Sequence, residues 1–461
     1  MTKVCIHNAL VVSGTGVKPG GIVINDDGRI ERVTGPSEEP ASAQNVIDAG
    51  GKMLFPGFVD AHVHMRDPGA PQKENFMSGT EAAACGGVTT VMCMPNTNPP
   101  VTDLEGVSAT LNAGNGKSYV DYCIQAALNK NNLNNIDALW GAGVTSFEVF
   151  LSDAPKDDLL EIEDYFEVAT AVERVGGILG VYTGSQKLLE RRLTALRQAR
   201  GQEAGFHELS KARHPFDEAL GITAVTEICQ HTRVKTVLRQ TCTARGFAIA
   251  RSAKQHDPTL PLAIEVTPHH LHLTNRIIED FQGFAYMIPP LRSEEDCDAA
   301  VASIADQTVD FIGSDHAPHE AGVKMAADPW TVPGGVPGLD TIVPAALDLA
   351  ANELISYADV ARVLCERPAM LFGLADRKGF LSPGNDGDVV LVDPKETREI
   401  SPIDIRSKAG RSPFEGYRLR GRVVLSLLRG DVISKSGNLV ATGPNGEFLT
   451  RGTDGWNHRD A

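Results

Sequence analysis

Short runs of apolar and β-branched residues recur along the middle of the chain, with stretches of helical periodicity between them. Eight such runs predict strands, at residues 57–64, 88–95, 118–127, 144–151, 177–183, 235–242, 261–267 and 309–314. Helical patterns lie between several of them, at residues 101–113, 156–175, 215–230 and 339–354. Eight strand-then-helix units in roughly 320 residues predict an α/β fold, a closed (β/α)8 barrel of the TIM type.

The two ends of the chain show a different pattern, with alternating apolar and polar residues and frequent turns. "GIVINDDGRIERV" near the start contains an Asp-Gly turn signal, and "GRVVLSLLRGDVIS" near the end reads similarly. We expect the first 55 residues to form a small antiparallel layer. Residues 1–55 and 376–440 would then build one small β-sandwich domain, 56–375 a hydrolase barrel, and 441–461 a polar tail.

Composition narrows the class of partner. The chain has 461 residues, 42% of them hydrophobic and 22% charged, with a net charge of −16. That charge disfavours nucleic acid and anionic membranes, which attract basic surfaces. No run of 18 apolar residues and no signal-peptide pattern occurs, and the eight cysteines are dispersed without a Cys-x-x-Cys pair. We therefore expect a cytoplasmic protein with reduced, mostly buried thiols.

Polar side chains stand where the predicted strands end. In a (β/α)8 barrel the chemistry takes place at the carboxyl ends of the strands. The side chains found there are His62, His64, Asn96, Glu148, Asp153, Tyr182, Gln240, His269, His270, Asp315 and His316. This placement predicts a functional site at that end of the barrel.

The segment "FVDAHVHMRD" holds two histidines that share one face of a strand, because successive side chains point to opposite sides. His62 and His64 could therefore bind one divalent cation. The alternative is a pair of satisfied core histidines. Asp315 in "GSDHAPH" favours the metal, because a carboxylate after an apolar strand is costly without a cation or proton donor.

Six ordered motifs carry a family resemblance: "FPGFVDAHVHMRDPG", "GGVTTVMCMPNTNPP", "EVTPHHLHLT", "PPLRSEEDCDA", "GSDHAPHE" and "GGVPGLDT". They resemble the cyclic amidohydrolases of the amidohydrolase superfamily, most of all the dihydroorotases, with hydantoinases and allantoinases next. The resemblance covers essentially the whole chain. It implies a barrel flanked by a small β domain, metal-dependent opening of a cyclic amide, and a homodimer or homotetramer.

The resemblance also implies residue roles. His62 and His64 match the histidines of the first metal, and Asp315 matches the ligand on strand eight that also moves the proton. A second set matches the group that holds the substrate carboxylate in dihydroorotases: Arg66, Asn96 and His319. A guanidinium suits that role because it can bind a carboxylate with two hydrogen bonds. The alternative for Arg66 is a salt bridge to Asp67 or to a loop carboxylate.

Four departures from the family pattern concern the second metal and the ring. Glu148 stands where the family has a carboxylated lysine, although Asp153 could take that role. Tyr182 and Gln240 stand where it has histidines, and neither residue type is a common zinc ligand. Ile288 replaces an asparagine that contacts the pyrimidine ring. We therefore expect one divalent metal, zinc with manganese as the alternative, and an absent second metal.

Two hypotheses follow. The first is an enzyme that hydrolyses a carboxylate-bearing cyclic amide, imide or ureide, with Asp315 as proton acceptor and Glu148 as metal ligand or second acid-base. Tyr182 would donate a hydrogen bond to the oxyanion, and Gln240 and Ile288 would shape the pocket. The second is an inactive dihydroorotase-like homologue that serves as an assembly subunit, for example with aspartate transcarbamoylase.

Overall fold

The computed structural model describes residues 2–36, 38 and 41–456. Its strands are β1 (Thr2–Ser13), β2 (Gly16–Asn25), β3 (Ile30–Thr34), β4 (Asn45–Asp48), β5 (Met53–Pro56), β6 (Phe58–Val63), β7 (Val88–Cys93), β8 (Asp121–Ile124), β9 (Ala126–Ala127), β10 (Phe147–Phe150), β11 (Ile178–Tyr182), β12 (Lys235–Leu238), β13 (Leu262–Val266), β14 (Phe311–Ile312), β15 (Val389–Glu399), β16 (Arg418–Leu428), β17 (Asp431–Lys435) and β18 (Asn438–Leu439).

The helices are α1 (Phe76–Gly86), α2 (Leu104–Gly114), α3 (Ile136–Gly141), α4 (Ile162–Glu173), α5 (Gln186–Arg200), α6 (Phe206–Ala212), α7 (Pro215–Thr232), α8 (Ala244–His256), α9 (Pro268–His272), α10 (Ile278–Phe281), α11 (Glu294–Ala305), α12 (Ala321–Lys324), α13 (Ile342–Ala351), α14 (Tyr357–Ala361) and α15 (Arg367–Leu371). Across the described ranges, no helix combines the length and apolar character needed to cross a membrane.

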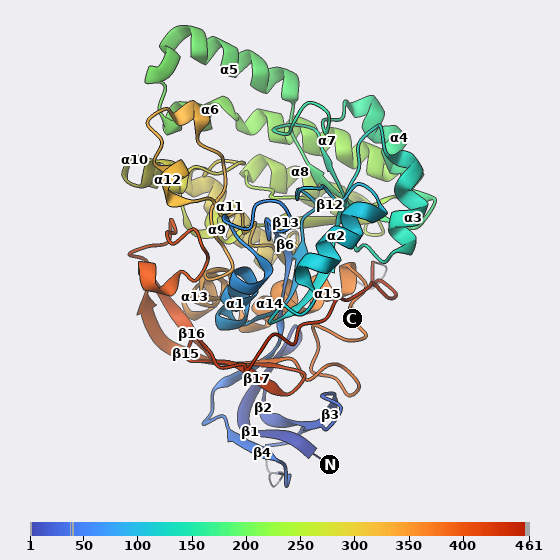
Figure 1. Cartoon of the computed structure of the whole chain (residues 1–461), viewed down its shortest axis with the longest axis vertical. Helices are drawn as coiled ribbons and strands as arrows, with labels where there is room; N and C mark the ends of the chain where they lie inside the picture. Colours follow the sequence, from blue (N-terminus) through green and yellow to red (C-terminus); the bar gives the residue numbers. More distant parts are fainter. Residues whose placement is uncertain (1, 37, 39–40, 457–461) are drawn as a thin grey trace.

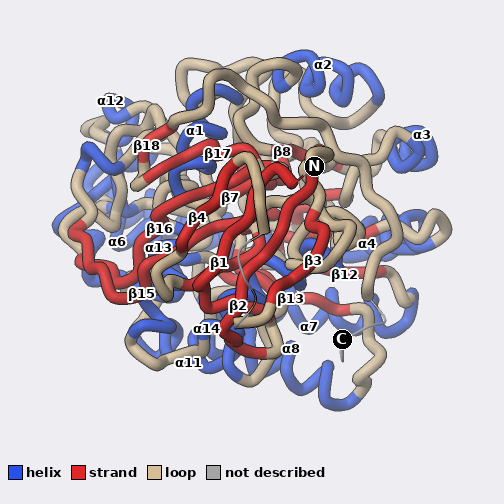
Figure 2. Tube along the Cα trace, turned by 90° about the horizontal axis from the view of Figure 1, so that it is seen from below, coloured by secondary structure: helices blue, strands red, loops and turns tan. Residues whose placement is uncertain are grey.

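One nine-stranded sheet joins the two ends of the chain, within the residues described. Its order is β18-β17-β16-β15-β5-β1-β2-β3, with β4 paired to β1, and the pairing of β5 with β15 connects the first strands to the last. Figure 2 shows this sheet from below, and Figure 1 places β1 to β4 at the opposite end of the molecule from α5. The expectation of an antiparallel layer was wrong in part, because β4 and β5 both pair with β1 in parallel.

The middle of the chain forms parallel strands in the predicted order. A three-stranded sheet runs β6-β7-β8, and a six-stranded one runs β14-β13-β12-β11-β10-β9, as far as the structure describes the chain. The predicted strand 118–127 is divided into β8 and β9, which follow each other along the chain. A parallel bridge between Val63 and His316 links the end of β6 to the segment after β14. The carboxyl ends of the first and last parallel strands therefore lie side by side.

The parallel strands in the middle of the chain are mostly buried. Every residue of β6, β7 and β13 is buried, as expected when helices or other layers cover both faces of a sheet. The apolar runs that predict these strands arise for this reason. Glu148 of β10 and Glu265 of β13 are also buried. Because a buried charged group needs a partner, both carboxylates are expected to pair with polar or charged groups in the interior.

The C-terminal segment packs against the parallel strands. Phe448 forms a bridge with Tyr122, and the indole Nε1 of Trp456 donates to the carbonyl of Leu371 at 2.9 Å. Residues 457–461 lie outside the described part of the chain. The eight cysteines are all free and buried, as the sequence predicts.

Candidate metal centre and substrate cavity

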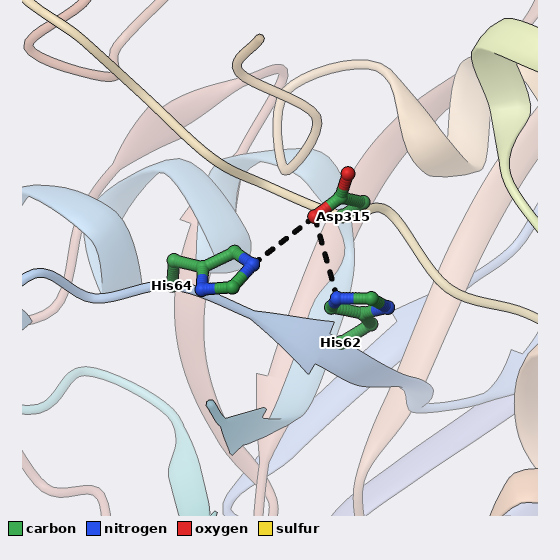
Figure 3. A group of neighbouring side chains, drawn as sticks. All are labelled: His62, His64 and Asp315. Atoms are coloured by element: carbon green, nitrogen blue, oxygen red, sulfur yellow. Dashed lines mark hydrogen bonds and ion pairs between the residues drawn. The ribbon is translucent and has the colours of Figure 1, made fainter. Parts of the chain in front are cut away.

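His62 lies on β6 and His64 directly after it, and both imidazoles face Asp315. Their Nε2 atoms lie 3.3 and 3.1 Å from Oδ1 of Asp315. Figure 3 draws both contacts as dashed lines. One ligand atom from each of the three residues lies within 4.8 Å of the other two. A histidine pair with one carboxylate is a donor set that zinc accepts, so these three residues fit a divalent metal ion.

The other nitrogen of each imidazole is held by a separate partner. His62 Nδ1 lies 2.6 Å from Oε1 of Glu265, and His64 Nδ1 lies 2.7 Å from Oδ1 of Asn96. Because a carboxylate and an amide oxygen only accept, both Nδ1 atoms carry the proton. The Nε2 lone pairs are therefore free to face the centre, the arrangement that metal-binding histidines require.

Burial and charge act in opposite directions on these groups. Burial raises the pKa of Asp315, but His62 and His64 outweigh it and hold that pKa well below its usual range. Burial lowers the pKa of His64 to about 4. For His62 burial also lowers the pKa, but the charges of Glu265 and Asp315 outweigh this and raise it. Asp315 is therefore ionised and His64 neutral at pH 7, the states that bind a metal.

Four residues of the predicted site adopt left-handed backbone conformations. The φ angles are 58° at Arg66, 56° at Asp153, 52° at Gln240 and 45° at Asp315. Residues other than glycine reach this region at a cost, and such residues cluster at functional sites. The backbone that follows four strands is thus bent to aim these side chains.

Gln240 and Tyr182 lie against the same three residues. The Gln240 amide donates to Oδ2 of Asp315 at 2.5 Å, which leaves Oδ1 turned toward the histidines. The Tyr182 hydroxyl lies 2.9 Å from His62 Nε2, and its ring stacks on Phe150 with centroids 4.4 Å apart. Both side chains therefore contact the atoms that would bind the metal.

Within the described residues, neither alternative for a ligand on strand four belongs to the group formed by His62, His64 and Asp315. Glu148 is fully buried in a salt bridge with Arg239 at 2.7 Å. Asp153 forms a two-pronged salt bridge with Arg213 in the cavity wall. Within the described residues, the group of ligand atoms around Asp315 contains neither carboxylate. Glu148 pairs with Arg239 and Asp153 with Arg213, and no local sequence pattern reveals either salt bridge.

Sequence reasoning missed the charged network beneath the histidines. Arg239 links Glu148 and Glu265, with both ion pairs fully buried, and Glu265 in turn holds His62. A signal was present, because Arg239 and Glu265 each interrupt or end an apolar run, in "VLRQ" and "AIEV". Arg239 lies 91 residues from Glu148 and 26 residues from Glu265 along the chain, so the sequence could not predict these pairings.

A cavity of about 300 Å³ opens beside this centre. His64 and Asp315 line this cavity, together with Ile288, Tyr182 and Gln240. The three residues predicted to bind the substrate carboxylate also line it: Arg66, Asn96 and His319. His319 Nε2 lies 3.4 Å from Nη2 of Arg66. In the described chain no carboxylate pairs with Arg66, and two buried nitrogens, Arg66 Nε and His319 Nδ1, have no hydrogen-bond partner. His319 Nε2 also lies 3.1 Å from the carbonyl oxygen of Gly334, which only accepts, so Nε2 carries the proton and Nδ1 is an acceptor. The unpaired Nε–H of Arg66 is the donor here that suits an anionic ligand.

Comparison with known proteins identifies the family. The sequence profile described as "Amidohydrolase family" matches residues 53–433. The chain belongs to the amidohydrolase family. This amidohydrolase is 32% identical to the dihydroorotase of Methanosarcina acetivorans over 457 residues. That alignment covers 97% of this chain and 96% of the dihydroorotase. It is 30% identical over 448 residues to the allantoinase of Rubrobacter xylanophilus, with 95% and 97% covered.

Solved structures agree with the sequence comparison. The L-hydantoinase from Arthrobacter aurescens matches with a TM-score of 0.93 and 26% identity, over 98% of this chain and 100% of that one. The predicted resemblance is confirmed, and the protein is an enzyme of the cyclic amidohydrolase kind with the α/β fold of that family. The family generally uses divalent metals such as zinc, and the three ligands here fit one.

Proposed function

We propose that this amidohydrolase hydrolyses the C–N bond of a carboxylate-bearing cyclic amide, imide or ureide, with one divalent metal ion. The observation that carries the proposal is the convergence of His62, His64 and Asp315 on one side of a cavity whose other wall presents the unpaired Arg66 guanidinium. His62, His64 and Asp315 would hold the metal. A divalent ion bound there would acidify a water molecule and polarise the ring carbonyl.

The carboxylate of the substrate would bind to Arg66, Asn96 and His319. Asn96 accepts from His64 through its oxygen, so its amide N–H groups remain for a ligand. Arg66 Nε is already desolvated and unpartnered. A carboxylate that accepts a hydrogen bond from it gains that bond without a further desolvation cost to the protein. The ring is thereby oriented toward Asp315.

Asp315 would move the proton in this reaction. It is ionised, and it would accept a proton from the attacking water and deliver it to the leaving ring nitrogen. Tyr182 would donate a hydrogen bond from its hydroxyl to the developing oxyanion, because that hydroxyl lies 2.9 Å from Nε2 of His62. Gln240 would hold Asp315 in place through Oδ2.

The ring-binding wall favours a less polar substrate than dihydroorotate. Ile288 lines the cavity and offers no hydrogen bond to a ring amide. Leaving such a group unpaired costs about 1–3 kcal/mol. We therefore place carboxylate-bearing rings with fewer N–H and C=O groups than dihydroorotate ahead of it as substrates.

The test combines metal analysis with a substrate panel. Protein purified without added metal should contain one divalent ion per chain, and His62→Ala and Asp315→Ala should lose it. Hydrolysis of 5-carboxymethyl-hydantoin, dihydroorotate and unsubstituted hydantoin would then be compared by loss of ring absorbance. If the purified protein contains no metal and does not bind added Zn²⁺ or Mn²⁺, the proposal is contradicted. That result would favour the alternative of an inactive assembly subunit.

We also propose the finer features of architecture and assembly. The two parallel sheets would close into one (β/α)8 barrel spanning 56–375, an idea supported by the Val63–His316 bridge. Residues 1–55 and 376–440 would form the β-sandwich domain and 441–461 the tail. The enzyme would act as a homodimer or homotetramer, and in the cytoplasm, where free thiols such as its eight cysteines persist.

A further inference from the structure

Arg239 occupies the floor of the cavity with every donor satisfied. Its Nε and Nη2 donate to the two oxygens of Glu148 at 3.0 and 2.7 Å, and its Nη1 donates to Glu265 at 2.6 Å. The remaining two N–H groups donate to the side-chain oxygen of Gln125 and the carbonyl of Ala61. Because no N–H group is left over, Arg239 is not available to bind a substrate.

The two glutamates need a cation in this position. Both carboxylates have no solvent-exposed surface, and an ionised carboxylate in such a place is stable only beside a positive charge. Glu265 is shared, with one oxygen facing Arg239 and the other facing His62 Nδ1. A single residue, Glu265, therefore connects the Arg239 guanidinium to the imidazole of His62.

We propose that Arg239 is the resident second cation of this site. It neutralises Glu148 and Glu265 in place of a second divalent ion, and it thereby limits the enzyme to one metal. The inference rests on the proposed function, in which His62, His64 and Asp315 bind the first metal. Removing the guanidinium would expose oxygen ligands from Glu148, Glu265 and Gln125, a set suited to Mn²⁺.

A second buried cation supplies the matched control. Lys254 forms a salt bridge with Asp310 at 2.5 Å, and its side chain is 9% exposed. Asp310 also pairs with Arg367 at 2.9 Å, so it keeps a cation when Lys254 is replaced. Lys254 and Asp310 are absent from the lining of the cavity, and within the described residues Asp310 belongs to no group of possible metal ligands. Replacing Lys254 thus removes a buried charge of the same sign without freeing a set of carboxylates that could bind a metal ion.

The experiment measures the manganese content and the electron paramagnetic resonance spectrum of wild type, Arg239→Met and Lys254→Met. Wild type and Lys254→Met should hold one ion with the six-line spectrum of isolated Mn²⁺. Arg239→Met should hold two ions with a spin-coupled spectrum. A double variant carrying Arg239→Met and Glu148→Gln should return to one ion, because it lacks the freed carboxylate.

Loss of folding is also informative. If Arg239→Met unfolds in metal-free buffer, millimolar Mn²⁺ should restore its thermal transition, whereas Lys254→Met should gain no such rescue. A folded Arg239→Met that still holds one ion, or one that Mn²⁺ cannot rescue, would overturn the inference and leave the proposed function intact. A wild type without any metal would contradict the proposed function, and the gain of one ion in Arg239→Met over wild type would still support the role of Arg239.

Discussion

His62 Nδ1 lies 2.6 Å from Oε1 of Glu265, and neither side chain has any exposed surface. The contact fixes the tautomer of His62 and turns its Nε2 toward Asp315. Partners of this kind raise the basicity of a metal-binding imidazole and limit its rotation. Glu265 therefore acts on the metal through His62 rather than by direct contact.

Glu265→Gln should weaken metal binding about 10- to 100-fold, because the amide interacts less strongly with the Nδ1 proton than a carboxylate does. A competition titration with a metal-binding dye would measure the change. Glu366→Gln is the matched control, since that glutamate is also buried but accepts from the backbone of Gly14. Equal weakening in both variants would assign the effect to general instability.

Arg66→Met should reduce kcat/KM about 10- to 100-fold for a carboxylate-bearing ring, mainly through KM. The loss corresponds to one or two hydrogen bonds between charged groups. Unsubstituted hydantoin lacks the carboxylate, so its kcat/KM should change little. Steady-state kinetics on both substrates would measure the difference, and an equal loss on the two would remove Arg66 from carboxylate recognition.

Tyr182→Phe should lower kcat about 10²- to 10³-fold while the metal content stays the same. The change removes one hydroxyl donor near the reacting carbonyl but preserves the ring that stacks on Phe150. Single-turnover rates and elemental analysis of the same preparation would check it. Unchanged turnover would show that Tyr182 has no part in the chemistry.

Lys324 makes stability depend on pH in a definite direction. Its ammonium is 5% exposed and donates to the carbonyls of Tyr286, Pro333 and Gly335 at 2.8 to 3.0 Å. Burial, with a smaller effect of Arg66, lowers its pKa from 10.5 to about 7. Between these values the unfolded chain keeps a proton that the folded chain releases, so stability rises with pH across this window.

Lys324→Met should remove this contribution. The free energy of unfolding of wild type minus that of the variant should rise between pH 7 and 10, with a slope approaching about 1.4 kcal/mol per pH unit. Urea unfolding at pH 7, 8 and 9 would measure it, with Lys130→Met as an exposed control. A difference that is flat with pH would mean that the buried amine is protonated throughout.

The strand order and the position of the site could be read from the chain because their causes are local. An apolar run is buried on both faces of a parallel sheet, so "GVTTVMCM" predicts β7 without knowledge of its neighbours. His62 and His64 share a face through the two-residue period of a strand. Asp315 follows another apolar run, and the ends of parallel strands meet at one edge. The family resemblance was likewise carried by contiguous motifs.

Tertiary structure decided which charges meet. Glu148 pairs with Arg239, and Asp153 with Arg213, across 91 and 60 residues of chain. Among the described residues, both carboxylates lie outside the group of ligand atoms formed by His62, His64 and Asp315. β1 pairs in parallel with β4 and β5 because of the direction in which the chain returns to the sheet. The alternation of apolar and polar residues predicts the strands but not this direction. Side-chain type determines what a residue can bind, whereas its partner in the low-dielectric interior determines whether it is free to do so.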